Sequence, residues 1–344
     1  MIYLIGWLLI YYYLIVRFLV QHRVRLLAVV VVLLLGGLAI FRGAVGTDTV
    51  AYEKLVFDSE RMAGIEPGFW LLISILKGVI PDPVFVIRGL AFIFTILIWW
   101  FIWKADDDEL FFIMSFIFPL FFYAFSMNVL RMGLASAIFL IALQLDRRDQ
   151  KHKAILMAFV SVLFHYSMIF TILYMWLSNE QIVGKYKIYG IFFIIVIVLI
   201  FMALNEIYFV IKIQNYAVTE PPGMLSGLSR VILCVILLIG IWFSSLPRVE
   251  VYRLLLWTLL FMGIFWGITR ISYAGLRMLD LLVFSLSIAI MRSYNRAAKP
   301  VDRSVKLSWL LAGLIGAVGV YRNMLQETFW SSSPWLPYHT VFDR

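Results

Sequence analysis

The stretch VFVIRGLAFIFTILIWWFIW, residues 84–103, decides the fold class of this chain. It carries one charged residue, Arg88, in a run as long as a helix needs to cross the hydrocarbon core of a bilayer, about 20 residues. Comparable apolar runs lie at 1–20, 24–41, 110–126, 129–145, 187–204, 227–246, 252–269, 276–291 and 306–321. The pattern predicts an all-α polytopic membrane protein with about 10 transmembrane helices plus short re-entrant or broken helices.

Composition argues against a separate soluble domain. Of the 344 residues, 63% are hydrophobic and 14% are charged, and no stretch is polar enough to fold in water alone. Residues 1–20 lack a basic n-region and a small-residue cleavage site, which predicts a retained first helix rather than a signal peptide. We expect a single integral membrane domain, 1–344, with external loops at 42–68 and 205–226 and an external C-terminal tail at 322–344.

The net charge of +9 comes from short basic clusters between the apolar runs. This arrangement is typical of cytoplasmic loops that follow the positive-inside rule, and it argues against nucleic acid as a partner. Cys234 is the only cysteine, so the sequence offers neither a disulfide nor a thiolate metal site.

Two segments do not fit a simple alternation of crossings. Segment 69–80 is too short to cross comfortably, and segment 154–177 is long and has His165 near its centre. If the first is a re-entrant or interfacial helix and the second is a hairpin of two short helices, every basic cluster falls on the cytoplasmic side. A helix broken at membrane depth is tolerated only where it is buried in protein or lines a cavity. The topology therefore marks His165 as a candidate site residue.

Arginine outnumbers lysine among the polar residues that this topology places on the external face. The planar guanidinium binds phosphate or carboxylate through two parallel hydrogen bonds, so this face favours a large anion as its ligand. The candidate site residues are Arg42, Asp48, Glu66, Arg131, His165, Arg270, Arg277 and Tyr338.

Three of these candidates have a simple structural alternative. Arg42 and Arg131 lie at the ends of apolar runs, where an arginine can bury its stem and extend its charge to the interface. A lone membrane histidine such as His165 is more often a satisfied buried side chain than a catalyst.

The remaining charged candidates have alternatives of their own. Asp48 can cap a helix that starts at Thr49, because aspartate is a favoured N-cap residue. Arg270 and Arg277 are seven residues apart and lie on one helical face if their helix begins early; together with Asp280 they would form a structural ion pair.

The acidic run at 106–109, Asp-Asp-Asp-Glu, contains a pattern that holds metal and nucleotide sugar in other enzymes. That chemistry needs a soluble nucleotide-binding domain, so we expect a solvated acidic loop here. The four histidines have no metal-ligand spacing, and no phosphate-cradling glycine loop occurs. We therefore expect neither a metal nor another cofactor.

Short motifs follow one another in a specific order along the chain. The first external segment contains Arg42, Gly46-Thr47-Asp48, Tyr52, Phe57 and Glu66-Pro67-Gly68-Phe69. Later come Leu130-Arg131-Met132-Gly133-Leu134-Ala135, Phe164-His165-Tyr166-Ser167 and a terminal Pro337-Tyr338. In order and spacing these motifs resemble the EpsG/Wzy-type polysaccharide polymerases over most of the chain. Met132 departs from the glutamine that the resemblance leads us to expect.

The resemblance implies a membrane glycosyltransferase similar to the O-antigen polymerases and, more distantly, to the O-antigen ligases of the GT-C type. Such enzymes join oligosaccharide repeat units on undecaprenyl diphosphate at the periplasmic or outer face of the bacterial inner membrane, in polysaccharide and lipopolysaccharide biosynthesis. Donor and acceptor are both lipid-linked oligosaccharides in the bilayer, and no nucleotide sugar is required. A chain-length regulator and a flippase are expected neighbours.

Roles for the candidates follow as hypotheses. Arg131 and Arg270 would stabilise the departing diphosphate, which removes the need for a metal. The general base would be His165 or Asp48. The supporting substrate-binding residues would be Arg42, Arg277, Glu66 and Tyr338, with Asp48 or Glu66 positioning the acceptor sugar.

Two other classes of protein stay open. A flippase or transporter of lipid-linked sugars would also have an arginine-lined cavity, but such proteins often contain internal repeats and none is found here. A membrane-bound acyltransferase would use a membrane histidine such as His165 and would need fewer external arginines.

Overall fold

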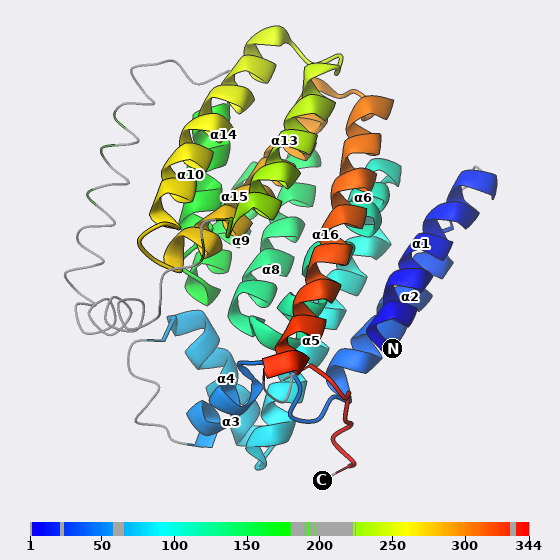
Figure 1. Cartoon of the computed structure of the whole chain (residues 1–344), viewed down its shortest axis with the longest axis vertical. Helices are drawn as coiled ribbons and strands as arrows, with labels where there is room; N and C mark the ends of the chain where they lie inside the picture. The colour runs from blue at the N-terminus through cyan, green and yellow to red at the C-terminus, as the bar shows by residue number, and fades with distance from the viewer. Residues whose placement is uncertain are drawn as a thin grey trace. The chain divides into compact units, whose positions relative to one another are not determined.

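A computed structural model of the chain describes residues 2–20, 24–57, 65–179, 225–330 and 335–343, together with positions 189, 192, 196 and 223. Within these residues the named elements are all helices (Figure 1). Those long and apolar enough to cross a membrane are α1 (Ile2–Val20), α5 (Pro83–Lys104), the segment Asp107–Asn128, α14 (Arg248–Ile268), α15 (Ala274–Ala297) and Arg303–Leu325 of α16 (Arg303–Trp330). The chain is a polytopic membrane protein.

The other helices are shorter. They are α2 (Arg25–Ile40), α3 (Thr49–Phe57), α4 (Pro67–Val79), α8 (Leu130–Arg147), α9 (Lys151–Phe164), α10 (Met168–Ser178) and α13 (Leu228–Trp242). The predicted external segment 42–68 therefore contains a helix, and α16 continues into the predicted tail. The predicted crossing at 187–204 and the loop at 205–226 lie outside the described residues except at isolated positions, so both stay predictions.

The chain forms two compact units, one of Met1–Tyr166 with Trp309–Arg344 and one of Ser167–Ser308. In the first unit, α8 packs along α9 and α2 packs along α5 (Figure 1). In the second, α15 contacts α10, α13 and α14 and forms the centre of the unit. Buried hydroxyl pairs join its helices, for example Thr171 with Ser285 at 3.0 Å, because polar groups in an apolar interior need partners.

The segment Asp107–Asn128 is not a regular α-helix. It runs through α6 (Asp107–Phe112), a π-helical turn η2 (Ile113–Ile117), α7 (Phe118–Tyr123) and a second π-helical turn η3 (Ala124–Asn128). Pro119 has no N–H to donate to the carbonyl of Ser115, four residues earlier. Gly313 of α16 packs against this carbonyl, since a Cβ on Gly313 would lie 1.9 Å from Ser115 O. Such π-helical turns are frequent at functional sites.

A helix break interrupts the predicted long segment 154–177. α9 ends at Phe164, His165 is extended with φ −156° and ψ 117°, and α10 begins at Met168. The prediction of a break near His165 is confirmed. Segment 69–80 forms most of the 13-residue helix α4, which is too short to span a bilayer by itself.

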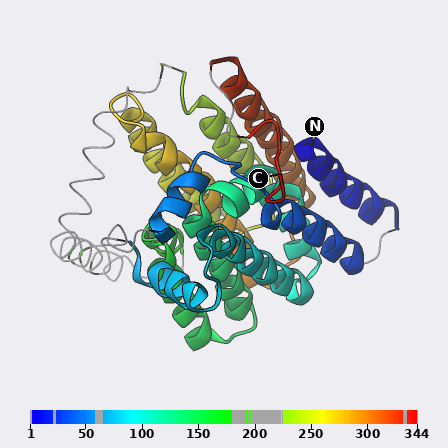
Figure 2. The same ribbon diagram turned by 90° about the horizontal axis from the view of Figure 1, so that it is seen from below.

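Residues 335–343 lie along the loop that follows α2. The N–H of Gly43 donates to His339 O at 2.7 Å, and Tyr338 Oη donates to Leu38 O at 2.8 Å. Figure 2 shows this tail, in red, beside the C-terminal end of α2. Tyr338 thus fastens the tail, and its predicted contact with substrate stays a prediction.

Candidate functional site

Glu66 joins two candidate residues that are distant in sequence. Its Oε2 accepts a hydrogen bond from Arg131 Nη1 at 2.7 Å, and its Oε1 lies 2.8 Å from His165 Nδ1. The Glu66 side chain is 0% exposed, whereas those of Arg131 and His165 are 20% and 19% exposed. We call these three residues the Glu66 cluster. The carboxylate is therefore enclosed, whereas the side chains of Arg131 and His165 on either side of it are partly exposed.

Three different helix ends supply the cluster. Glu66 is the N-cap residue of α4, Arg131 lies in the first turn of α8, and His165 is the C-cap residue of α9. All three belong to the unit that includes Met1–Tyr166. Because α8 packs along α9 and α4 contacts α9, the helix packing brings these ends together.

The motif Glu66-Pro67-Gly68-Phe69 has a structural reason at each position. Pro67 occupies the first turn of α4, where its fixed φ and missing N–H suit a helix start. Phe69 is fully buried and packs its ring 5.9 Å from that of Tyr52. A Cβ on Gly68 would lie 2.9 Å from the backbone carbonyl oxygen of Leu163, so only glycine lets α4 approach the end of α9 this closely. That approach sets the distance between Glu66 and His165.

Gly68→Ala is expected to push α4 away from α9 and to destabilise the protein by about 1–3 kcal/mol, because the obstructing atom is backbone. Gly78→Ala is the matched control on the same helix, since a Cβ there meets nothing within 4 Å. The control should keep or slightly raise the melting temperature, because alanine is the better helix former. Melting temperatures that fall equally in both variants would contradict the close-approach argument.

The motif Gly46-Thr47-Asp48 is tied to the end of η3. Asn128 Oδ1 accepts hydrogen bonds from the backbone N–H of Asp48 and from Thr47 Oγ1, both at 2.8 Å. Gly46 has φ +98°, a left-handed conformation that glycine adopts without strain. α3 begins at Thr49, the helix start that the capping alternative for Asp48 assumed, and capping by the Asp48 side chain stays a prediction. The half-buried Asp48 is thereby held near the cluster, and its role as a base stays a prediction.

Sequence reasoning did not assign roles to Asn128 and Tyr52, which the structure links to the site. Tyr52 is 7% exposed on α3 and interacts electrostatically with Arg131, Asp48 and Glu66. Burial raises the pKa of the Tyr52 hydroxyl, so it stays protonated at neutral pH. The signal for Asn128 was a polar amide three residues before Arg131 in an otherwise apolar run.

The electrostatics of the cluster favour an ionised Glu66. Burial by itself raises the pKa of this carboxyl, but the hydrogen bond from His165 and the charge of Arg131 outweigh it and lower the pKa to about 2. An ionised carboxylate only accepts hydrogen bonds, so the hydrogen between Glu66 and His165 must sit on Nδ1.

This pKa shift predicts a pH dependence of stability. A carboxyl whose pKa falls from 4.5 when unfolded to about 2 when folded stabilises the protein above about pH 4.5. The contribution, on the order of 3 kcal/mol, is lost as the pH falls to about 2. The difference in melting temperature between wild type and Glu66→Gln should therefore narrow over this range in thermal unfolding experiments. A difference that stays constant with pH would contradict the prediction.

Arg42 is fully buried, which excludes the snorkelling alternative for this residue. Its Nη1 donates to Ala39 O at 2.7 Å and to Ser126 O at 3.1 Å. Arg88 donates in turn to the backbone carbonyl of Arg42 at 2.8 Å and pairs with Glu53 at 3.1 Å. The two arginines thus hold the backbone of the loop after α2 through its carbonyl groups. A direct contact of Arg42 with substrate stays a prediction.

Arg270 and Arg277 belong to the second unit, Ser167–Ser308. They do not share a helix, because α14 ends at Ile268 and α15 begins at Ala274. Each guanidinium lies over a ring, that of Arg270 over Trp266 at 4.8 Å and that of Arg277 over Tyr273 at 5.7 Å. Asp280 pairs with Arg230 at 2.8 Å and so was wrongly assigned to Arg277 and Arg270. Substrate binding by both arginines stays a prediction.

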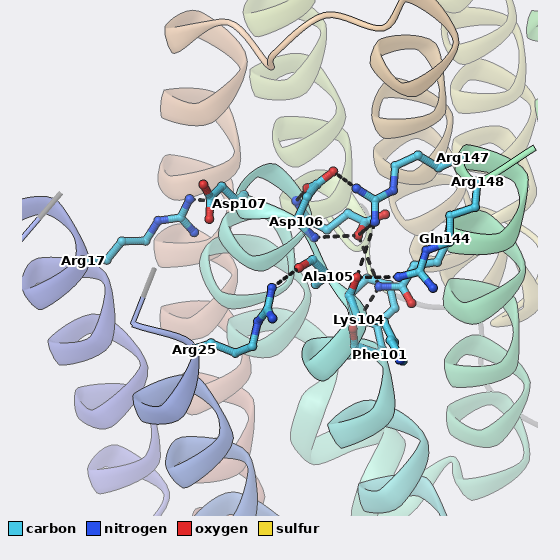
Figure 3. A network of polar contacts seen from close by, with 11 residues as sticks. Arg17, Arg25, Phe101, Lys104, Ala105, Asp106, Asp107, Gln144, Arg147 and Arg148 are labelled. Atoms are coloured by element: carbon cyan, nitrogen blue, oxygen red, sulfur yellow. Dashed lines mark hydrogen bonds and ion pairs between the residues drawn. The ribbon is translucent and has the colours of Figure 1, made fainter. Parts of the chain in front are cut away.

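The sequence led us to expect a solvated loop at 106–109, and this expectation was wrong, because these residues form the start of α6. Asp106 caps α6 by accepting a hydrogen bond from the Glu109 N–H. The fully buried Glu109 side chain accepts one from the Asp106 N–H, which completes a capping box. Arg147 pairs with both carboxylates, and Gln144 donates to Glu109 at 3.2 Å (Figure 3). Asp106 and Glu109 therefore join α6 to α8. Among the described residues, no group of three or more His, Cys, Asp or Glu is placed to hold a metal.

The order of motifs along the chain can now be compared with known families. The model of the EpsG family matches residues 25–340, a span that includes every member of the Glu66 cluster. The chain belongs to the EpsG family. The resemblance inferred from the motifs is confirmed, and EpsG membership supports a role of the polysaccharide polymerase type, with glycosyltransferase chemistry. No curated protein and no solved structure matches the chain.

Proposed function

We propose that the protein is a polysaccharide polymerase that joins oligosaccharide repeat units carried on undecaprenyl diphosphate, at the periplasmic or outer face of a bacterial inner membrane. The observation that carries the proposal is the Glu66 cluster in a chain of the EpsG family: an enclosed carboxylate lies between a partly open arginine and a partly open histidine. An arginine suits a diphosphate leaving group, and a histidine suits a hydroxyl acceptor.

The reaction proposed is a glycosyl transfer between two lipid-linked units. A hydroxyl of the acceptor attacks the anomeric carbon of the donor, and its proton passes to Nε2 of His165. The new glycosidic C–O bond forms as the bond to the diphosphate oxygen breaks, and the electron pair leaves with the diphosphate. The proton on Nε2 then returns to water.

Arg131 is assigned to the leaving diphosphate. Preorganised donors aimed at developing negative charge are most effective in a site of reduced dielectric. Its Nη1 is taken by Glu66, while its buried Nε has no hydrogen-bond partner among the described residues. The Arg131 side chain is 20% exposed, so a diphosphate that reaches its guanidinium supplies hydrogen-bond acceptors that the protein itself does not provide.

The test is a reconstitution of the full-length protein in liposomes with purified lipid-linked repeat units. A ladder of polymer on a gel supports the proposed function. Transfer of the lipid-linked units across the bilayer without a ladder would instead identify a flippase, and single units with an added acyl group would identify an acyltransferase.

A further inference from the structure

We infer that Glu66 is a positioning residue: its carboxylate holds His165 with the proton on Nδ1 and the lone pair on Nε2, and Arg131 fixes that carboxylate. The inference rests on the proposed function for its catalytic meaning. We propose this role for Glu66 in place of the earlier hypothesis that it positions the acceptor sugar, because its side chain is fully buried.

The two oxygens of Glu66 are divided between its two partners. Oε1 faces His165 Nδ1 at 2.8 Å, and Oε2 accepts from Arg131 Nη1 at 2.7 Å. A carboxylate bonded on both oxygens cannot rotate without breaking one bond. The histidine ring is thus held in one orientation, as carboxylates orient histidines in metal sites and in hydrolase triads.

The division also compensates charge during the proposed reaction. When Nε2 takes the proton of the acceptor hydroxyl, the imidazolium formed faces an ionised carboxylate across 2.8 Å. Arg131 adds positive charge on the far side of that carboxylate. Three other titratable groups lie around the cluster. Tyr52 interacts electrostatically with Arg131, Glu66 and Asp48, and Tyr166 interacts with Glu66.

Glu66→Gln tests the inference, because an amide keeps the shape and removes the charge. Histidines labelled with ¹⁵N in the full-length protein report the tautomer directly, and single replacements assign the four histidine signals. In wild type we expect His165 with its proton on Nδ1, and in Glu66→Gln a mixture or the Nε2-protonated form. Glu53→Gln is the control, since it removes the carboxylate that pairs with Arg88 instead of the one that faces His165, and we expect the wild-type tautomer in it.

Kinetics with lipid-linked acceptor distinguish positioning from sugar binding. In Glu66→Gln we expect kcat to fall about 100-fold with KM for the acceptor little changed. The acid limb of the pH–rate profile should move to lower pH, because the imidazolium loses its carboxylate partner. Should Glu66→Gln fail to fold, Glu66→Asp keeps the charge and should retain the wild-type tautomer with a reduced kcat.

An unchanged tautomer and pH profile in Glu66→Gln would overturn the inference, as would a rise in acceptor KM at constant kcat. Failure of the inference leaves the proposed function standing if wild type still makes a ladder. Absence of a ladder in wild type removes the proposed function, and the tautomer measurement then still decides whether Glu66 positions His165.

Discussion

Replacing His165 by asparagine is expected to lower the rate of polymer formation by about 100-fold or more. The asparagine amide nitrogen takes the place of Nδ1, so it can keep the hydrogen bond to Glu66 Oε1 that the histidine makes at 2.8 Å. What the variant loses is Nε2, the atom assigned to the acceptor proton. Initial rates with lipid-linked repeat units, followed as polymer on gels, measure the effect.

His152→Asn is the control for this experiment. His152 is exposed near the start of α9, the helix that His165 ends, so its replacement should leave the rate unchanged. Wild-type polymerisation by a folded His165→Asn protein would remove His165 as the base and leave Asp48, held beside Asn128, as the candidate.

The second large effect is expected for Arg131→Lys, which should reduce polymer formation about 100-fold while the protein stays folded. Lysine keeps a positive charge for the buried Glu66, so no carboxylate is left unpaired. Its single ammonium cannot hold Glu66, as Nη1 does, and at the same time offer the diphosphate the planar fork of a guanidinium. Polymer length on gels and the melting temperature are the two measurements.

Arg148→Lys is the matched control at the other end of α8. This arginine is exposed and donates to the backbone carbonyl of Lys104 at 2.8 Å, a contact that an ammonium can also make. Normal polymer length in the Arg131→Lys variant would refute the diphosphate role of Arg131. A melting temperature far below that of Arg148→Lys would show that the guanidinium is needed for folding instead.

The sequence identified the residues of the Glu66 cluster as candidates but did not predict the contacts between them. His165 was identified because the positive-inside rule required segment 154–177 to be two short helices with a break near His165, and that break is present. Nothing in the pattern showed that Glu66 would be shared by Arg131 and His165, 65 and 99 residues away in the chain. Such a pairing depends on helix packing, which apolar periodicity does not encode.

Burial was the property that the sequence predicted least well. Arg42 and Arg131 both lie at the ends of apolar runs, yet Arg42 is fully buried and Arg131 is 20% exposed. The acidic run at 106–109 has the composition of a solvated loop, but it is paired with Arg147. In each case a residue far away in the chain supplies a partner, which is Ser126 for Arg42, Glu66 for Arg131 and Arg147 for the acidic run. Only the folded chain brings these partners near.

By itself the sequence determined the membrane class, the helix break at His165 and the EpsG family, because hydrophobic length and local motifs are properties of the chain. The tertiary structure decided which of the charged residues meet. Contacts through Gly68 and the packing of α8 along α9 bring three helix ends together around one buried carboxylate. A buried charge must be paired wherever the fold encloses it, and only the packed structure shows that Glu66 is enclosed and that Arg131 and His165 are its partners.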